Sequence, residues 1–393
     1  MFDKLDTIDW PILKTAYGTA DALPIALRNL AAPDEEVRVA AWYTVRSELE
    51  HQGTVYQASA YAAPFLVEWL AELPHEDKRD LVTFLASLAR GAGYKRQHLN
   101  LTDEQLKQDP IFQQEMAEEI RWVELTHQAV RQGMDLYLAF LDDQDLELRM
   151  ATTYLLASFK EDQVRLIPHL RFYLERETDE RMIGCLLLSL GQLLPTTGDS
   201  PILLMPYLTA SSTPLVRFCA AMALSFLLKE TIPEEVVNVF FSAFTNPASL
   251  QAVYDELPTT WAGRAVDFHA LEFLYWLTSS RHRDRIIGRL AELLPALDEV
   301  VALDVADRLL HAAFHWDEFG PPPEVAREDL NAEHRVVLHA IASSSLMWVA
   351  EQSPQDQEIW SGIRQDLLSL DLPTTQQDLR AFLALDEPSD CAG

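Results

Sequence analysis

The sequence contains little glycine and little cysteine. Its 13 glycines are outnumbered by 21 prolines. Sheets and hairpins use glycine in their turns, whereas helices can begin with proline and avoid glycine internally. The shortage of glycine therefore favours an all-α chain. The three cysteines show no close Cys/Cys or Cys/His spacing, which argues for reduced thiols and against a zinc site.

Long apolar runs and positive charge are scarce as well. The apolar stretch 182–194 is interrupted by Gly191 and Gln192 and falls short of the roughly 18 to 20 apolar residues of a membrane span. The first residues, MFDKLDTIDW, have no apolar run behind a basic segment, so we expect no secretory signal and a cytoplasmic protein. Lys and Arg number 31 against 61 Asp and Glu, and the net charge of −30 opposes binding to duplex nucleic acid.

The common catalytic motifs are missing too. The chain has no Gly-rich phosphate loop, no Gly-x-Ser-x-Gly elbow and no Cys/His arrangement with a plausible nucleophile. We therefore assign no catalytic residue and expect no cofactor. A helical array can nevertheless assemble a site from distant side chains, so an enzyme stays possible.

What the sequence does contain is a recurring pattern. An apolar residue followed by arginine opens the runs VRVAAWYTV at 37–45, LRMATTYLL at 148–156 and VRFCAAMAL at 216–224. A weaker copy, DERMIGCLLLSL, has Arg181 in the arginine position. The step from Arg149 to Arg181 is 32 residues and the step from Arg181 to Arg217 is 36, which is typical of helical-repeat units.

Shorter apolar segments between these runs open with Pro64, Pro168 and Pro206. Proline at the first turn of a helix loses no hydrogen bond, so these segments are predicted to be the second helices of helix pairs. One helical hairpin cannot bury both of its faces. Stacked hairpins would complete each other's core and form an extended concave surface.

The pattern resembles the HEAT-repeat family, whose paired helices carry proline in the first helix and an Asp/Val-Arg pattern at the start of the second. Val37-Arg38 matches this pattern well and the segment 213–217 matches it in part. The resemblance covers roughly residues 20–230. HQGTVYQASAYAAPFLVEWL at His51–Leu70 looks like a segment of bacterial HEAT-repeat proteins of uncharacterised function. The resemblance implies a right-handed α-solenoid of antiparallel helix pairs and a bacterial source, but no reaction.

The chain is expected to form one continuous array. Residues 1–244 would be the HEAT-like repeats, with a loop insertion near 91–110. Residues 245–385 would continue as helical repeats and capping helices, and 386–393 would be a disordered tail.

One candidate partner-binding patch follows the first VR helix. Together with Trp42 and Tyr43 it would consist of four polar residues: His51, Gln52, Thr54 and Tyr56. The alternative interpretation is structural. Gly53 would end a helix in the left-handed conformation and Thr54 would begin the next one.

A second candidate is the densest positive cluster of the chain: Arg281, Arg283, Arg285 and Arg289. These arginines could bind an anion together with the free N–H groups of a helix capped by Ser279 or Ser280. Phosphate, nucleic acid or an acidic peptide would fit such a site. Alternatively, the arginines complement the C-terminal end of the preceding helix or lie over apolar neighbours.

His311 and His315 are four residues apart, so on a helix they would share a face and could hold a metal. The sequence HAAFH lacks the glutamate of the metalloprotease helix. We therefore expect packed histidines and no metal.

Together these patterns predict a protein-binding scaffold whose acidic groove holds a protein partner, with charge favouring a basic one. Five tryptophans are candidate anchors, although most are expected in the core: Trp42, Trp69, Trp122, Trp276 and Trp316. One alternative is an immunity-type inhibitor of a basic toxin such as a nuclease. Another is a HEAT-like enzyme, such as an alkylpurine DNA glycosylase or a phycobilin lyase, and a third is a subunit that works only in an assembly.

Overall fold

The computed structural model describes residues 2–98, 108–196, 198, 200–258, 261, 263–316, 329–349 and 357–384. In these ranges the chain is all-α, as the sequence predicts, and the strands are limited to two short antiparallel pairs. No helix there is long and apolar enough to cross a membrane. The predicted tail at 386–393 lies outside the described residues.

Contacts divide the chain into two compact units. The N-terminal unit comprises 1–223 and 252–263, and the C-terminal unit comprises 224–251 and 264–393. The division falls within helix α13 (Pro214–Leu228). The boundary at 244 and 245 that the sequence suggests stays a prediction.

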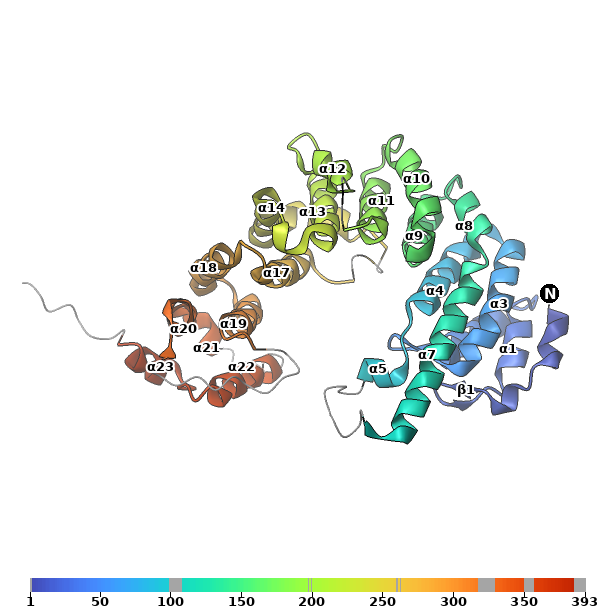
Figure 1. Ribbon diagram of the computed structural model, residues 1–393, viewed down its shortest axis with the longest axis horizontal. Coiled ribbons are helices and arrows are strands. Elements are labelled where there is room, and N and C mark those ends of the chain that lie inside the picture. Colours follow the sequence, from blue (N-terminus) through green and yellow to red (C-terminus); the bar gives the residue numbers. More distant parts are fainter. Residues whose placement is uncertain are drawn as a thin grey trace, which may run out of the picture. The chain divides into compact units, whose positions relative to one another are not determined.

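The N-terminal unit begins with two 3₁₀ helices (Phe2–Thr7 and Trp10–Ile12) and the pair β1 (Lys14–Thr15) and β2 (Gly18–Thr19). A second pair, β3 (Glu50–His51) and β4 (Thr54–Val55), follows later. Its helices, most of them labelled in Figure 1, are α1 (Leu23–Asn29), α2 (Glu35–Leu49), α3 (Gln57–Glu72), α4 (Lys78–Arg90), α5 (Tyr94–His98), α7 (Pro110–Arg131), α8 (Met134–Phe140), α9 (Leu146–Leu156), α10 (Gln163–Leu174), α11 (Glu180–Leu193), α12 (Ser200–Leu204) and most of α13.

The C-terminal unit contains α14 (Glu234–Thr245), α17 (Val266–Trp276), α18 (Arg283–Leu293), α19 (Glu299–Ala313), α20 (Ala332–Ser343), α21 (Ser345–Val349), α22 (Gln357–Ser369) and α23 (Gln376–Phe382). The short helix α15 (Gln251–Tyr254) lies at the division between the units. Within the C-terminal unit, α14 packs on α17, α18 on α20, and α19 on both α20 and α22. Single 3₁₀ turns join several of these helices.

The recurring arginine has a structural role at the start of its helix. Asp34 caps α2 by accepting from the backbone N–H of Val37, and Asp145 caps α9 in the same way. The arginine four residues after each capping aspartate folds its guanidinium back onto the turn that precedes the helix. Arg38 Nη1 donates to the carbonyl of Ala32 at 3.0 Å, and Arg149 Nη1 donates to that of Asp143 at 3.0 Å. The repeated Asp and Arg thus fix the turn between paired helices.

Two proline predictions were wrong. Pro64 lies inside α3 and Pro168 lies inside α10, rather than at their first turns. The α3 helix begins seven residues earlier, where the backbone N–H of Tyr56 donates to Ser59 Oγ at 3.0 Å and so satisfies a donor at the helix start. The local cap therefore overrides the usual preference of proline for a helix start.

The core of the N-terminal unit is built by α4, α9 and α11, which pack one on the next, and by α13 (Figure 1). The helices α11 and α13 approach closely at Gly191, where a Cβ atom would lie 2.6 Å from the Cα of Ala223. Cys185 and Cys219 lie fully buried in these two helices as free thiols. Burial raises the pKa of Cys185, and it raises that of Cys219 to about 12.

Candidate functional site

The predicted patch after α2 is a β-hairpin. β3 and β4 pair antiparallel, and the two turn residues, Gln52 and Gly53, have φ values of 50° and 79°. Two-residue hairpin turns of this kind require positive φ at both positions. The structural alternative for this segment was therefore wrong: Gly53 turns a hairpin rather than ending α2, and Thr54 lies in β4 rather than starting α3.

The hairpin residues face different partners. His51 Nδ1 lies 3.3 Å from the hydroxyl of Tyr17. Thr54 is fully buried with its Oγ1 atom 3.1 Å from His98 Nε2, so its predicted contact with a partner is wrong. Tyr56 is the residue that precedes α3, its backbone N–H donates to Ser59 Oγ, and burial raises the pKa of its phenol. Gln52 is exposed at the tip of the turn.

The four arginines of the predicted anion site have separate partners inside the C-terminal unit. Arg285 Nη1 lies 2.8 Å from Glu234 and Arg289 Nη1 lies 2.9 Å from Glu292. The guanidinium of Arg281 donates to the carbonyl of Ile232 at 3.2 Å.

Arg283 is the most enclosed of the four arginines. Its Nη2 and Nε atoms lie 2.8 and 3.2 Å from the two carboxylate oxygens of Glu333. The guanidinium also donates to the carbonyls of Thr278 and Ala312. Three of the four arginines therefore already hold a carboxylate of the chain itself, which an external anion would have to displace.

The two predicted packed histidines do not share a helix face. α19 ends at Ala313, and His315 follows it with a φ of 52°. His311 lies instead beside two carboxylates, with its Nε2 atom 3.8 Å from Asp307 and 3.6 Å from Asp366. Among the described residues these three side chains are the group that could hold a metal ion.

An open cavity of about 620 Å³ in the N-terminal unit is the strongest candidate for partner binding. It lies where the end of α1, the first half of α2, the end of α3 and the start of α4 meet. We call it the acidic groove, and its lining consists of Leu30, Ala31, Ala32, Glu35, Arg38, Val39, Trp42, Trp69, Glu72, Leu73, Pro74, Asp77, Asp80 and Leu81.

The floor of the acidic groove is apolar and aromatic. Trp69 is 9% exposed and Leu81 is 1% exposed, so both belong to the core as well as to the groove. Trp42 packs at a tilt against Trp69, with ring centroids 6.5 Å apart, and edge-on against Phe84 at 5.4 Å. These contacts hold the Trp42 ring in place at the groove surface.

The rim of the acidic groove carries four carboxylates and one guanidinium. Within the described chain only Asp80 of these acids has an ion-pair partner, Arg79 at 3.1 Å. The one lining cation, Arg38, donates to backbone carbonyls of the preceding turn. The groove therefore offers negative charge that the chain itself does not neutralise.

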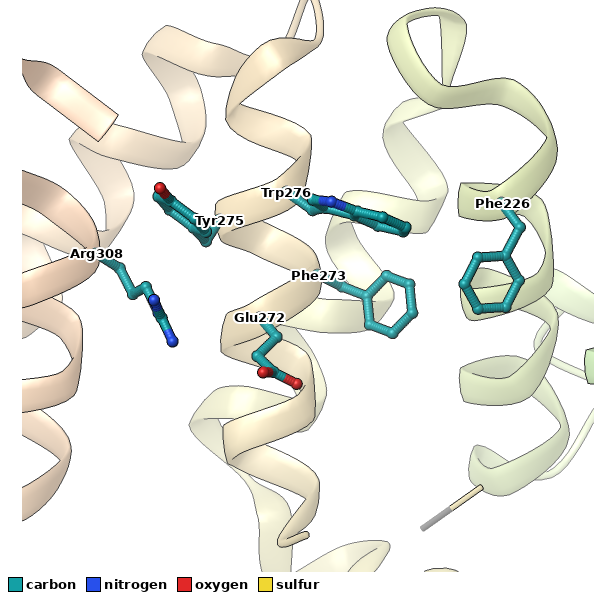
Figure 2. Close-up of a pocket in the computed structure, with 6 residues that line it drawn as sticks. All are labelled: Phe226, Glu272, Phe273, Tyr275, Trp276 and Arg308. Carbon is teal, nitrogen blue, oxygen red and sulfur yellow. The ribbon is translucent and has the colours of Figure 1, made fainter. Parts of the chain in front are cut away.

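A second cavity, of about 340 Å³, lies in the C-terminal unit and is rich in aromatic side chains. Figure 2 shows Phe273 and Trp276 pointing from α17 toward Phe226 of α13. Their rings meet edge-on, with centroids 5.8 to 6.1 Å apart. Tyr275 and Arg308 lie on the other side of α17, and Trp276 is 58% exposed. This group is an aromatic surface that a partner could cover.

Comparison with known proteins adds little. No protein-family model and no curated protein matches the chain. Among solved structures, the chain is similar to an engineered protein seen in a crystal, with 15% identity and a TM-score of 0.30 over 93% of this chain and 97% of that one. A TM-score of this size carries no argument about fold or function.

Proposed function

We propose that the chain is a HEAT-like right-handed α-solenoid that acts as a protein-binding scaffold, and that its acidic groove holds a basic segment of a partner protein. The observation that carries the proposal is the set of carboxylates around an aromatic floor, three of which have no ion-pair partner among the described residues: Glu35, Glu72 and Asp77. Lysine and arginine side chains would meet both the carboxylates and a tryptophan ring, which attracts cations.

Charge complementarity supports a basic partner over other classes. The chain carries a net charge of −30, so long-range attraction would speed its encounter with a basic protein. A duplex nucleic acid would be repelled by the same lining, because its binding needs positive groups that neutralise phosphates. Inhibition of a basic toxin is a narrower form of the same proposal.

The exposed aromatic surface of the C-terminal unit supports a binding role independently. Binding energy at protein interfaces is concentrated in a few aromatic and arginine side chains. Trp276 has that character, since it is 58% exposed yet packed against two phenylalanine rings. The scaffold would then have a second anchor in the C-terminal unit.

The test compares two variants with the same change in net charge. The groove variant combines Glu35→Gln, Glu72→Gln and Asp77→Asn. The control variant combines Glu36→Gln, Glu68→Gln and Glu124→Gln, which are exposed acids outside the groove lining. Fluorescence anisotropy then follows the binding of a short labelled arginine-rich peptide to each full-length chain.

We expect the groove variant to bind the peptide at least about tenfold more weakly than the control variant, since each lost contact contributes about 0.5–1 kcal/mol. Long-range attraction is reduced equally in both variants, so it cancels in the comparison. An equal loss in the two variants would leave only nonspecific charge attraction, and a wild-type chain that does not bind the peptide would refute the groove as a basic-segment site.

A further inference from the structure

Three potential metal ligands meet between two helices of the C-terminal unit. Asp307 and His311 are one turn apart on α19, and Asp366 faces them from α22, which packs on α19. The imidazole nitrogen and the two carboxylate oxygens all lie within 4.8 Å of one another. Residues 59 positions apart in sequence therefore share one small space.

The distances among these donors suit an ion better than hydrogen bonds. His311 Nε2 lies 3.6 Å from Asp366 Oδ2 and 3.8 Å from Asp307 Oδ1. N–H···O bonds are about 2.7–3.2 Å long. Ligand atoms bound at about 2.1 Å around a tetrahedral ion lie about 3.4 Å apart. The two imidazole–carboxylate distances are within a few tenths of an ångström of that spacing.

Burial and charge also favour a cation here. The side chains of His311, Asp366 and Asp307 are 11%, 17% and 30% exposed. Two carboxylates held this close repel each other unless a positive charge lies between them. The imidazole must be neutral to bind an ion, so a proton on His311 would compete with an ion for this place.

The surrounding side chains hold the donors in orientation. The His311 ring stacks on Trp316 with centroids 5.0 Å apart and planes only 4° from parallel. Asp307 Oδ2 lies 3.7 Å from Arg308 Nη1, and Asp307 Oδ1 faces the imidazole of His311. Partners of this kind orient ligands in metal sites and tune their affinity.

We propose that Asp307, His311 and Asp366 bind a divalent transition-metal ion of the zinc class. An imidazole nitrogen in the donor set favours zinc over magnesium and calcium, which prefer oxygen ligands. Three protein ligands leave at least one coordination position for water or for a side chain of a partner. This site is independent of the acidic groove, so the two proposals stand or fall separately.

The test is calorimetric titration of the full-length chain, free of any histidine tag, with zinc chloride at neutral pH. We expect one saturable high-affinity ion per chain, and no comparable binding of magnesium chloride. His311→Gln and Asp366→Asn should each weaken zinc binding at least about tenfold. His315→Gln is the matched control, because His315 is exposed just beyond α19 and should leave the affinity unchanged.

Two further readouts keep the result interpretable. Zinc affinity should rise as the pH rises through the pKa of His311, because the bound imidazole must be neutral. Cobalt(II) should give the visible absorption of a tetrahedral site in the wild type but not in His311→Gln. If Asp366→Asn disturbs folding by circular dichroism, Asp307→Asn replaces it. Absence of stoichiometric zinc binding by the wild type, or equal binding by His311→Gln, overturns the proposal.

Discussion

Replacement of Arg283 distinguishes a structural guanidinium from an anion site. Arg283→Met keeps the apolar stem but removes the two-point contact with Glu333 that joins α18 to α20. It also leaves the carbonyls of Thr278 and Ala312 without this donor. The Glu333 carboxylate would then be mostly enclosed without a positive partner.

The expected cost follows from the exposure of the pair. Breaking a buried ion pair costs about 3–5 kcal/mol, whereas exposed pairs contribute about 0–1 kcal/mol. Both side chains are 22% exposed, so we expect Arg283→Met to lower the free energy of unfolding by about 2–3 kcal/mol. In the control Arg289→Met the lost partner is Glu292 of the same helix, and these side chains are 54% and 68% exposed. We expect a loss below about 0.5 kcal/mol there.

Urea unfolding, monitored by circular dichroism and tryptophan fluorescence, measures the loss of stability in both variants. If the two units unfold separately, the data are fitted with two transitions. A double-mutant cycle with Glu333→Gln isolates the pair, and we expect a coupling energy of about 1–2 kcal/mol. Equal stability of Arg283→Met and Arg289→Met would refute the structural role. Stabilisation of the wild type by added phosphate, absent in Arg283→Met, would instead revive the anion site.

Two further predictions concern packing and pH. Gly191→Ala should lower the free energy of unfolding by about 1–3 kcal/mol in thermal unfolding, because its Cβ would meet the backbone of α13. Gly288→Ala, whose Cβ meets nothing within 4 Å in mid-α18, is the control and should be neutral or stabilising. The hydrogen-bonded guanidinium of Arg131 lowers the pKa of Asp162 below its ordinary 3.8. The ion pair therefore stabilises the folded state fully above pH 3.8, and this stabilisation is lost as the pH falls through the lowered pKa of Asp162. Acid titration of stability should show a shallower loss below about pH 4 in Asp162→Asn, and an unchanged slope would contradict this.

Local features were the ones that the sequence predicted well. The arginine after the apolar residue marks real helix starts, because the cap and the turn it fixes lie within six residues of it. The structural role of Gly53 was harder to predict. A helix end and a two-residue hairpin both place glycine at positive φ, and the choice depends on partners distant in sequence, such as the bridge from Thr54 to Ala92.

The candidate sites depend on stacking that the sequence does not encode locally. Glu35, Glu72 and Asp77 meet only because the ends of α2, α3 and α4 adjoin. The two acids in the first turn of α2 were a visible signal, but no neighbouring residue indicates that this turn and Asp77 face one cavity. Similarly, Arg283 finds its carboxylate 50 residues away at Glu333, which no spacing rule predicts.

The buried thiols make the chain convenient for selective labelling. Both Cys185 and Cys219 are fully buried, and burial raises the pKa of each thiol, so neither is expected to react with a thiol reagent near pH 8. With Cys391 replaced by serine, a new cysteine at Val39, which is 63% exposed in the groove lining, would take up a maleimide dye alone. The fluorescence of that dye would then report the binding of a basic peptide to the acidic groove.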